Sequence, residues 1–275
     1  MNLIRKNKYV INIYMNTLIK EFKSWYDKVE KMSDPTRNML TQHSIEETQP
    51  YKVSIPRQHY ICGLVSQEVY KNPSERLKSI SNFDLDENYN YDRTVVYKIS
   101  LEFDDIFIIG IRGTANSTLD LVTDLLIATG TDNLSFRKNI QVNLIKNIVN
   151  DLVSQGYTIP QCYITGHSLA GLISAYCIEQ IPEIIGVGFN VGSSPAQLKF
   201  KNPLSGETQI LSNREDNLRF INYHMENDII SSASVELFID TVIIKPRPAP
   251  KSEAEAHSMG FFLKSTSPNP YLGEF

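Results

Sequence analysis

The sequence has few cysteines, no long apolar run and no cluster of basic residues, and each absence argues against a class of protein. Its three cysteines are an odd number without a C-x-x-C pair, so neither a disulfide framework nor a zinc site is indicated. No apolar stretch reaches the roughly 18 residues that cross a bilayer, so we expect no transmembrane segment. The net charge is −4 without a Lys/Arg cluster to neutralise phosphates, so we expect no nucleic-acid partner.

Polar residues interrupt the apolar character of residues 3–18, and no small-residue cleavage site follows. A signal peptide is therefore not predicted, and we expect an intracellular protein. Hydrophobic residues make up 41% and charged residues 21% of the 275 residues, which is typical of a folded chain with a substantial core. We expect a single domain over residues 1–275, with an N-terminal segment of helix and loop at 1–90, a core at 91–263 and a C-terminal tail at 264–275.

The order of predicted elements in the core indicates an α/β fold. Two β-rich runs separated by Asp104-Asp105 predict a hairpin, and a helical apolar stripe closed by Gly156 follows them. Short apolar runs then alternate with a further helix. This alternation predicts a mostly parallel central sheet with helices on both faces. We expect strands at 94–103, 106–111, 162–165, 184–191 and 218–223, and helices at 15–29, 61–70, 140–153 and 169–181.

The peptide Gly166-His167-Ser168-Leu169-Ala170-Gly171 lies where a predicted strand passes into a predicted helix. This is the arrangement of the nucleophile elbow of α/β-hydrolases, in which a serine occupies a sharp, strained turn. Strand and helix nearly touch there, so the residues two before and two after the serine must be small, as Gly166 and Ala170 are. Alternatively, Ser168 merely caps the helix that follows it.

A serine hydroxyl needs a base to remove its proton, usually a histidine oriented by a carboxylate. Of the five histidines, His43 and His59 lie in or near predicted loops ahead of the sheet, and His167 sits beside the serine with its ring expected to point elsewhere. His224 ends a predicted strand, which is typical of a structural histidine. His257 lies on a late loop that can fold over the elbow, so it is the best candidate, with an exposed loop histidine as the alternative.

An α/β-hydrolase orders its triad as serine, acid and histidine, so the acid must lie between Ser168 and His257. Asp228 fits best, because it follows a predicted strand at the carboxyl edge of the sheet, where open α/β folds gather their sites. Glu226 and Asp240 are the other candidates, and Asp228 can also be explained as a turn residue.

Acyl transfer also requires hydrogen-bond donors for an oxyanion. The elbow supplies the backbone N–H of Leu169, at the start of the helix and with its dipole behind it. A second donor is expected after an earlier strand, and Thr114 fits through its N–H and its hydroxyl. From the residues alone, an ordinary strand-ending turn fits Arg112-Gly113-Thr114 equally well.

Together these residues resemble the class 3, fungal-type, lipase family of the α/β-hydrolase superfamily. Four blocks occur in family order over about residues 94–263, and Ala170, Leu121 and Ser231 depart from the family's usual glycine, tryptophan and proline. The blocks are Ile111-Arg112-Gly113-Thr114, which resembles R-G-[ST]; the elbow peptide, which is similar to G-H-S-L-G-G; Asn227-Asp228-Ile229-Ile230, which resembles N-D-x-[VI]-P; and the late His257.

The resemblance implies an α/β-hydrolase fold with residues 91–263 as its catalytic core, and a serine carboxylic-ester hydrolase acting on acylglycerols or related lipids. Ser168 would be the nucleophile, Asp228 the acid and His257 the base, with Thr114 and Leu169 forming the oxyanion hole. Neither a metal nor an organic cofactor is required. The alternatives are a phospholipase or acyltransferase variant, and a catalytically silent scaffold that binds lipid or protein.

The resemblance also implies a lid after the oxyanion segment. A short amphipathic helix there would open at a lipid surface and contact it transiently. A helix that packs into the core is the alternative. The apolar side of the expected lid consists of Leu119, Leu121, Val122, Leu125 and Leu126.

Overall fold

The computed structural model describes residues 52–100, 105–114, 136–192, 200–201, 208–209, 219–228, 231 and 241–269. All of them belong to the compact unit Gln49–Phe275. The helix expected at residues 15–29 lies outside the described residues. The α-helices of the described part are α3 (Arg57–Glu68), α5 (Phe136–Ser154), α6 (Leu169–Gln180), α9 (Glu253–His257) and α10 (Met259–Ser265), and the 3-10 helices are η1 (Pro73–Glu75), η2 (Glu87–Tyr89) and η4 (Ile159–Gln161).

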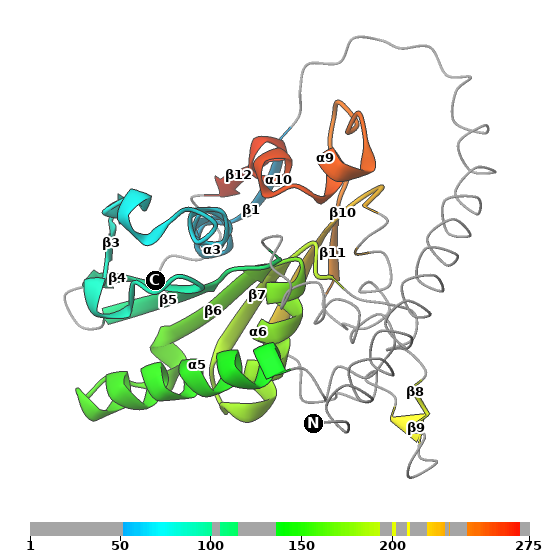
Figure 1. Ribbon diagram of the computed structural model, residues 1–275. Coiled ribbons are helices and arrows are strands. Elements are labelled where there is room, and N and C mark those ends of the chain that lie inside the picture. The colour runs from blue at the N-terminus through cyan, green and yellow to red at the C-terminus, as the bar shows by residue number, and fades with distance from the viewer. Residues whose placement is uncertain are drawn as a thin grey trace, which may run out of the picture. The chain divides into compact units, whose positions relative to one another are not determined.

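The described strands form one large mixed sheet and two small ones. The large sheet has the order β11-β10-β7-β6-β5-β4-β3-β2 (Figure 1). Strands β1 with β12 and β8 with β9 form the two small sheets. The strands are β1 (Val53–Pro56), β2 (Ser79–Ile80), β3 (Phe83–Leu85), β4 (Thr94–Ser100), β5 (Asp105–Ile111), β6 (Cys162–His167), β7 (Ile185–Phe189), β8 (Phe200–Lys201), β9 (Thr208–Gln209), β10 (Phe220–Met225), β11 (Thr241–Ile244) and β12 (Thr266–Asn269).

The large sheet is parallel from β5 through β6, β7 and β10 to β11, and antiparallel from β5 through β4 and β3 to β2. This confirms the predicted α/β fold with a mostly parallel central sheet. The predicted hairpin is also confirmed, because β4 and β5 pair antiparallel with Ser100 opposite Asp105. The parallel strands all end at one edge of the sheet, which gathers the residues that follow them.

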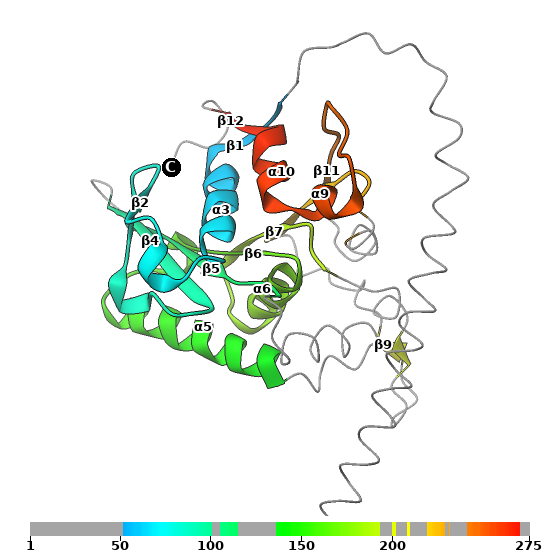
Figure 2. The same cartoon turned by 45° about the horizontal axis from the view of Figure 1, so that its top comes forward.

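Helices cover both faces of the sheet, as Figures 1 and 2 show: α5 and α6 lie on one face, and α3 and α10 on the other. Side chains of a strand alternate between faces, and β5 follows this rule. Phe107, Ile109 and Ile111 pack in the apolar cluster that includes α5 and α6. Ile106 and Ile108 pack in the cluster that includes α3 and α10. The continuous apolar run of β5 is therefore explained by its burial on both sides.

A small parallel sheet fixes the late part of the chain beside α3. Strand β1, just before α3, pairs with β12, just after α10, with Val53 opposite Thr266. Helix α10 packs against α3 through buried side chains that include Phe262 and Ile61. Since α9 directly precedes α10, this packing sets where His257 can lie.

Among the described residues, none of the helices is both long and apolar enough to cross a bilayer.

Candidate active site

Ser168 occupies a strained bend between β6 and α6. Its backbone has φ 58° and ψ −129°, a conformation that residues other than glycine adopt rarely because it costs conformational energy. Its N–H donates to the carbonyl of Phe189 at 3.0 Å, and its own carbonyl accepts from the N–H of Gly171 at 3.0 Å. These bonds from a neighbouring strand and from the helix hold the serine in its unfavourable conformation.

The small residues around Ser168 are required by a close crossing of strand and helix. A Cβ atom on Gly166 would lie 2.5 Å from the carbonyl carbon and 2.6 Å from the oxygen of Ala170. Backbone atoms cannot move aside as a flexible side chain can, so this position must be glycine. The methyl group of Ala170 is tolerated because Gly166 carries no side chain opposite it.

The structure brings together the three side chains expected to form a triad. The Oγ atom of Ser168 lies 2.9 Å from Nε2 of His257, and Nδ1 of His257 lies 2.8 Å from Oδ2 of Asp228. Ionised Asp228 only accepts hydrogen bonds, so Nδ1 of His257 donates to it and Nε2 is left to accept from the serine hydroxyl. The Asp228 side chain is fully buried and that of His257 is 14% exposed.

A second histidine is linked to the acid through a serine. The Ser231 hydroxyl donates to Oδ2 of Asp228 at 2.5 Å, and Nδ1 of His224 lies 2.9 Å from the same hydroxyl. The hydroxyl proton is directed to the carboxylate, so Nδ1 of His224 is the donor of the second bond. Burial is the main cause that lowers the pKa of His224, which favours its neutral form. The sequence marks Ser231 only as a departure from the proline of the lipase family that the chain resembles, which does not predict its bond to the acid.

The other candidate acids and bases do not join this group. Glu226 is paired with Lys245 at 3.3 Å, and its side chain is 44% exposed. The ring of His59 bonds to the Tyr223 hydroxyl at 2.7 Å. Asp240 and His43 lie outside the described residues.

Two buried side chains bond to the backbone of the base, and sequence reasoning missed both contacts. Nε2 of His167 lies 2.6 Å from the carbonyl oxygen of His257, and the side-chain amide of Asn190 donates to the same oxygen at 3.2 Å. The His167 ring thus bonds to the base rather than to the adjacent serine. The available signal for Asn190 was a polar residue at the end of a predicted strand, which by itself specifies no partner.

The two expected oxyanion donors lie on segments that meet beside the elbow. Leu169 is the first residue of α6, so its N–H is one of the helix's unpaired terminal donors. Thr114 follows β5, and a Cβ atom on the preceding Gly113 would lie 2.7 Å from the His167 carbonyl oxygen. Arg137 donates to the carbonyls of Arg112 and Gly113 at 2.6 and 3.0 Å, which fixes this loop against the start of α5.

The expected lid residues Leu119, Leu121, Val122, Leu125 and Leu126 all lie outside the described residues.

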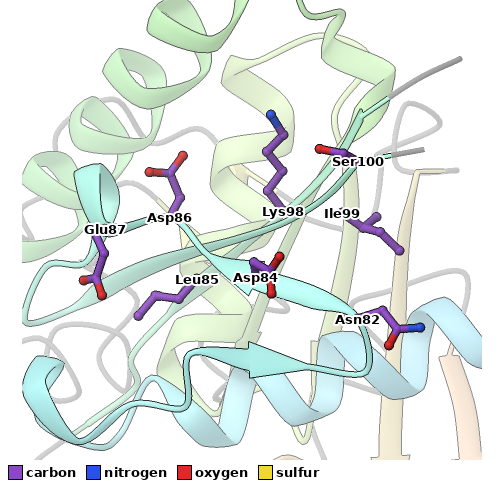
Figure 3. A pocket seen from close by; sticks show the side chains of 8 residues that line it. All are labelled: Asn82, Asp84, Leu85, Asp86, Glu87, Lys98, Ile99 and Ser100. Carbon is purple, nitrogen blue, oxygen red and sulfur yellow. The ribbon is translucent and has the colours of Figure 1, made fainter. Parts of the chain in front are cut away.

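Within the part that is described, no group of His, Cys, Asp and Glu side chains is placed to hold a metal ion. A separate concavity of about 510 Å³ lies over the antiparallel part of the sheet (Figure 3). It is rich in acidic groups, but Glu87 pairs with Lys78 and Lys98 pairs with Asp105 outside it. The lining residues are Asn82, Asp84, Leu85, Asp86, Glu87, Lys98, Ile99 and Ser100.

Comparison with known proteins finds no family model that matches the chain and no match among curated proteins. What the chain does must therefore be judged from the chemistry of its site.

Proposed function

We propose that the chain is a serine carboxylic-ester hydrolase with an α/β-hydrolase fold. The observation that carries the proposal is the unbroken hydrogen-bonded path from Ser168 Oγ through the His257 ring to Asp228, with bonds of 2.9 and 2.8 Å. The path begins at a serine with a strained backbone at a strand-to-helix bend. Strain of this kind persists only where the surrounding structure enforces it, and it concentrates at functional sites.

In the proposed reaction, Ser168 Oγ forms a bond to the ester carbonyl carbon while its proton passes to Nε2 of His257. The tetrahedral intermediate then breaks its bond to the alcohol oxygen, which takes that proton from His257 and leaves. Water attacks the acyl-enzyme with His257 again as base, releasing the acid and restoring the serine. The Asp228 carboxylate holds the imidazole in the required tautomer and stabilises it when it is protonated.

The negative charge of the intermediate needs donors fixed in advance. The N–H of Leu169 at the first turn of α6, with the positive end of the helix dipole, fits this role. Thr114 is proposed as the second donor, on a loop that Arg137 holds by two bonds to its carbonyls. Each such donor contributes on the order of 10²- to 10³-fold in rate.

The substrate class rests on the resemblance to class 3 lipases, which points to acylglycerols or related lipids. A water-soluble short-chain ester and a long-chain acylglycerol, each assayed with and without an emulsion surface, separate a general esterase from a lipase. A rate that rises when long-chain substrate forms an emulsion supports lipase activity. Activity confined to dissolved short-chain esters contradicts it and leaves the esterase.

The nucleophile is tested by covalent labelling with a fluorophosphonate probe, which phosphonylates activated serines. The wild-type protein is expected to be labelled and to hydrolyse p-nitrophenyl butyrate, while Ser168→Ala loses both. Removing the nucleophile of a triad costs about 10⁶-fold in kcat, so the variant should be indistinguishable from background. Equal labelling of the two proteins overturns the assignment. A folded wild type that is inert to probe and ester favours a silent scaffold.

A further inference from the structure

The base sits at the end of a short helix whose last carbonyls have no partner within it. The last four carbonyls of any α-helix lack intrahelical donors. In α9, the Glu255 carbonyl accepts from the N–H of Ser258 at 3.0 Å, but the next two depend on side chains from elsewhere. The Ala256 carbonyl accepts from Asn190 at 3.0 Å, and that of His257 accepts from both Asn190 and His167.

We propose that His167 and Asn190 are positioning residues, which set the place of the His257 imidazole by holding its backbone carbonyl. This inference rests on the hydrolase function proposed for the site. A carbonyl oxygen has two lone pairs, and here two donors at 2.6 and 3.2 Å occupy them. The base is thereby fixed through its own peptide group, independently of the bonds its ring makes to Ser168 and Asp228.

Asn190 ties the base to the strand that precedes the acid. Its side chain is fully buried, and its Oδ1 accepts from the N–H of Met225 at 2.8 Å, at the end of β10. Its own N–H donates to the Tyr223 carbonyl at 2.8 Å. The backbone has φ 45°, in the left-handed region that asparagine tolerates better than most residues. One amide group therefore sets the distance between β10, which leads to Asp228, and the helix that carries His257.

His167 ties the base to the nucleophile. It precedes Ser168 directly, so its backbone is part of the same bend. A carbonyl only accepts, so Nε2 of His167 carries the proton, and Nδ1 accepts from the Tyr70 hydroxyl at 3.0 Å. Burial, followed by the nearby His257, lowers the pKa of His167 to about 3 and keeps this neutral tautomer over the working pH range.

These contacts connect the base to the backbones of both of its triad partners. A misplacement of about 1 Å at a reacting group can cost roughly 10²-fold in rate. Loss of the His167 donor should therefore lower kcat by about 10- to 100-fold, while KM for a short ester changes less than about twofold, since substrate binding is not altered.

The test compares two substitutions of His167 that differ in one donor. His167→Phe keeps the ring shape without a donor, and His167→Gln keeps an N–H near the position of Nε2. We expect His167→Phe to lose kcat and His167→Gln to recover most of it. Asn190→Gly, which tolerates the positive φ, should lower kcat in the same way. His59→Phe is the matched control, because His59 also bonds a tyrosine hydroxyl but does not touch the triad.

For each variant, kcat and KM on p-nitrophenyl butyrate are measured together with the thermal unfolding midpoint and the fraction of protein labelled by the probe. A kcat loss in His167→Phe, at a midpoint similar to that of an active His59→Phe, supports the inference. Wild-type kcat in His167→Phe overturns it, as does equal impairment of the Phe and Gln variants, or a loss explained by unfolding. If the wild type itself is inert, the proposed function fails and the inference falls with it.

Discussion

Burial of the His167 imidazole should make the folded protein sensitive to mild acid. Burial lowers its pKa from the ordinary 6.5 to about 3 in the folded state. Between those two pH values the unfolded chain binds a proton that the folded chain does not. The free energy of unfolding therefore rises with pH across this window, and it falls as the pH is lowered from about 6.5 toward 3.

The size of the effect follows from the two pKa values. One proton bound only by the unfolded chain changes the free energy of unfolding by about 1.4 kcal/mol per pH unit. The difference in bound protons develops below about pH 6.5. Lowering the pH from about 7 to about 5 should therefore reduce the free energy of unfolding by ~2 kcal/mol through His167 alone. The glutamine in His167→Gln does not titrate, so this variant should lack that component.

The assay is urea unfolding of wild type and His167→Gln at pH 7 and pH 5. The wild type should lose ~2 kcal/mol more than the variant over this interval. Burial also lowers the pKa of His59, to about 4, but His59 is present in both proteins and its contribution cancels in the comparison. If both proteins lose the same stability, burial does not hold His167 neutral, and the acid sensitivity has another cause.

Two further substitutions test the elbow and the acid. Gly166→Ala would place a Cβ 2.5 Å from the carbonyl carbon of Ala170, so we expect a loss of ~1–3 kcal/mol in chemical denaturation; an unchanged midpoint would contradict the close crossing. Asp228→Asn should lower kcat on p-nitrophenyl butyrate by roughly 10⁴-fold with KM little changed, because the amide favours the wrong imidazole tautomer. A loss of less than tenfold would remove Asp228 from the triad.

The elements that the sequence predicts well are those whose signal is local. Helix α5 follows from apolar residues at helical spacing and ends at Ser154, shortly before Gly156, which has φ 99°. The antiparallel pairing of β4 with β5 follows from two β-rich runs that are close together in the sequence, although Asp105, expected between them, belongs to β5. The small residues of the elbow can likewise be recognised within five consecutive residues, because the clash that Gly166 avoids is with Ala170, four positions later.

The contacts that position the base have no such local signal. Asn190 is a single polar letter after an apolar run, and its role depends on β7 lying between β6 and β10. His167 could be set aside as the base from its place beside Ser168, but its bond to a carbonyl 90 residues later depends on where the last helices pack. Sequence order constrains which residues can meet, whereas the register of parallel strands decides which do.

That register explains how a base from the end of the chain reaches a serine in the middle. His167, at the end of β6, lies opposite Phe189 at the end of β7, and Phe189 lies opposite Tyr223 in β10. Strands β6 and β7 thus end in step, while β10 runs on to Met225. Ser168 and Asn190, just beyond the first two strands, both bond to His257. Ordering one residue costs about 1–2 kcal/mol of backbone entropy, a cost that several hydrogen bonds to fixed strand ends can offset. The base lies at the end of the short helix α9 rather than on the expected loop, and contacts from residues at the ends of β6 and β7 can therefore hold it in place.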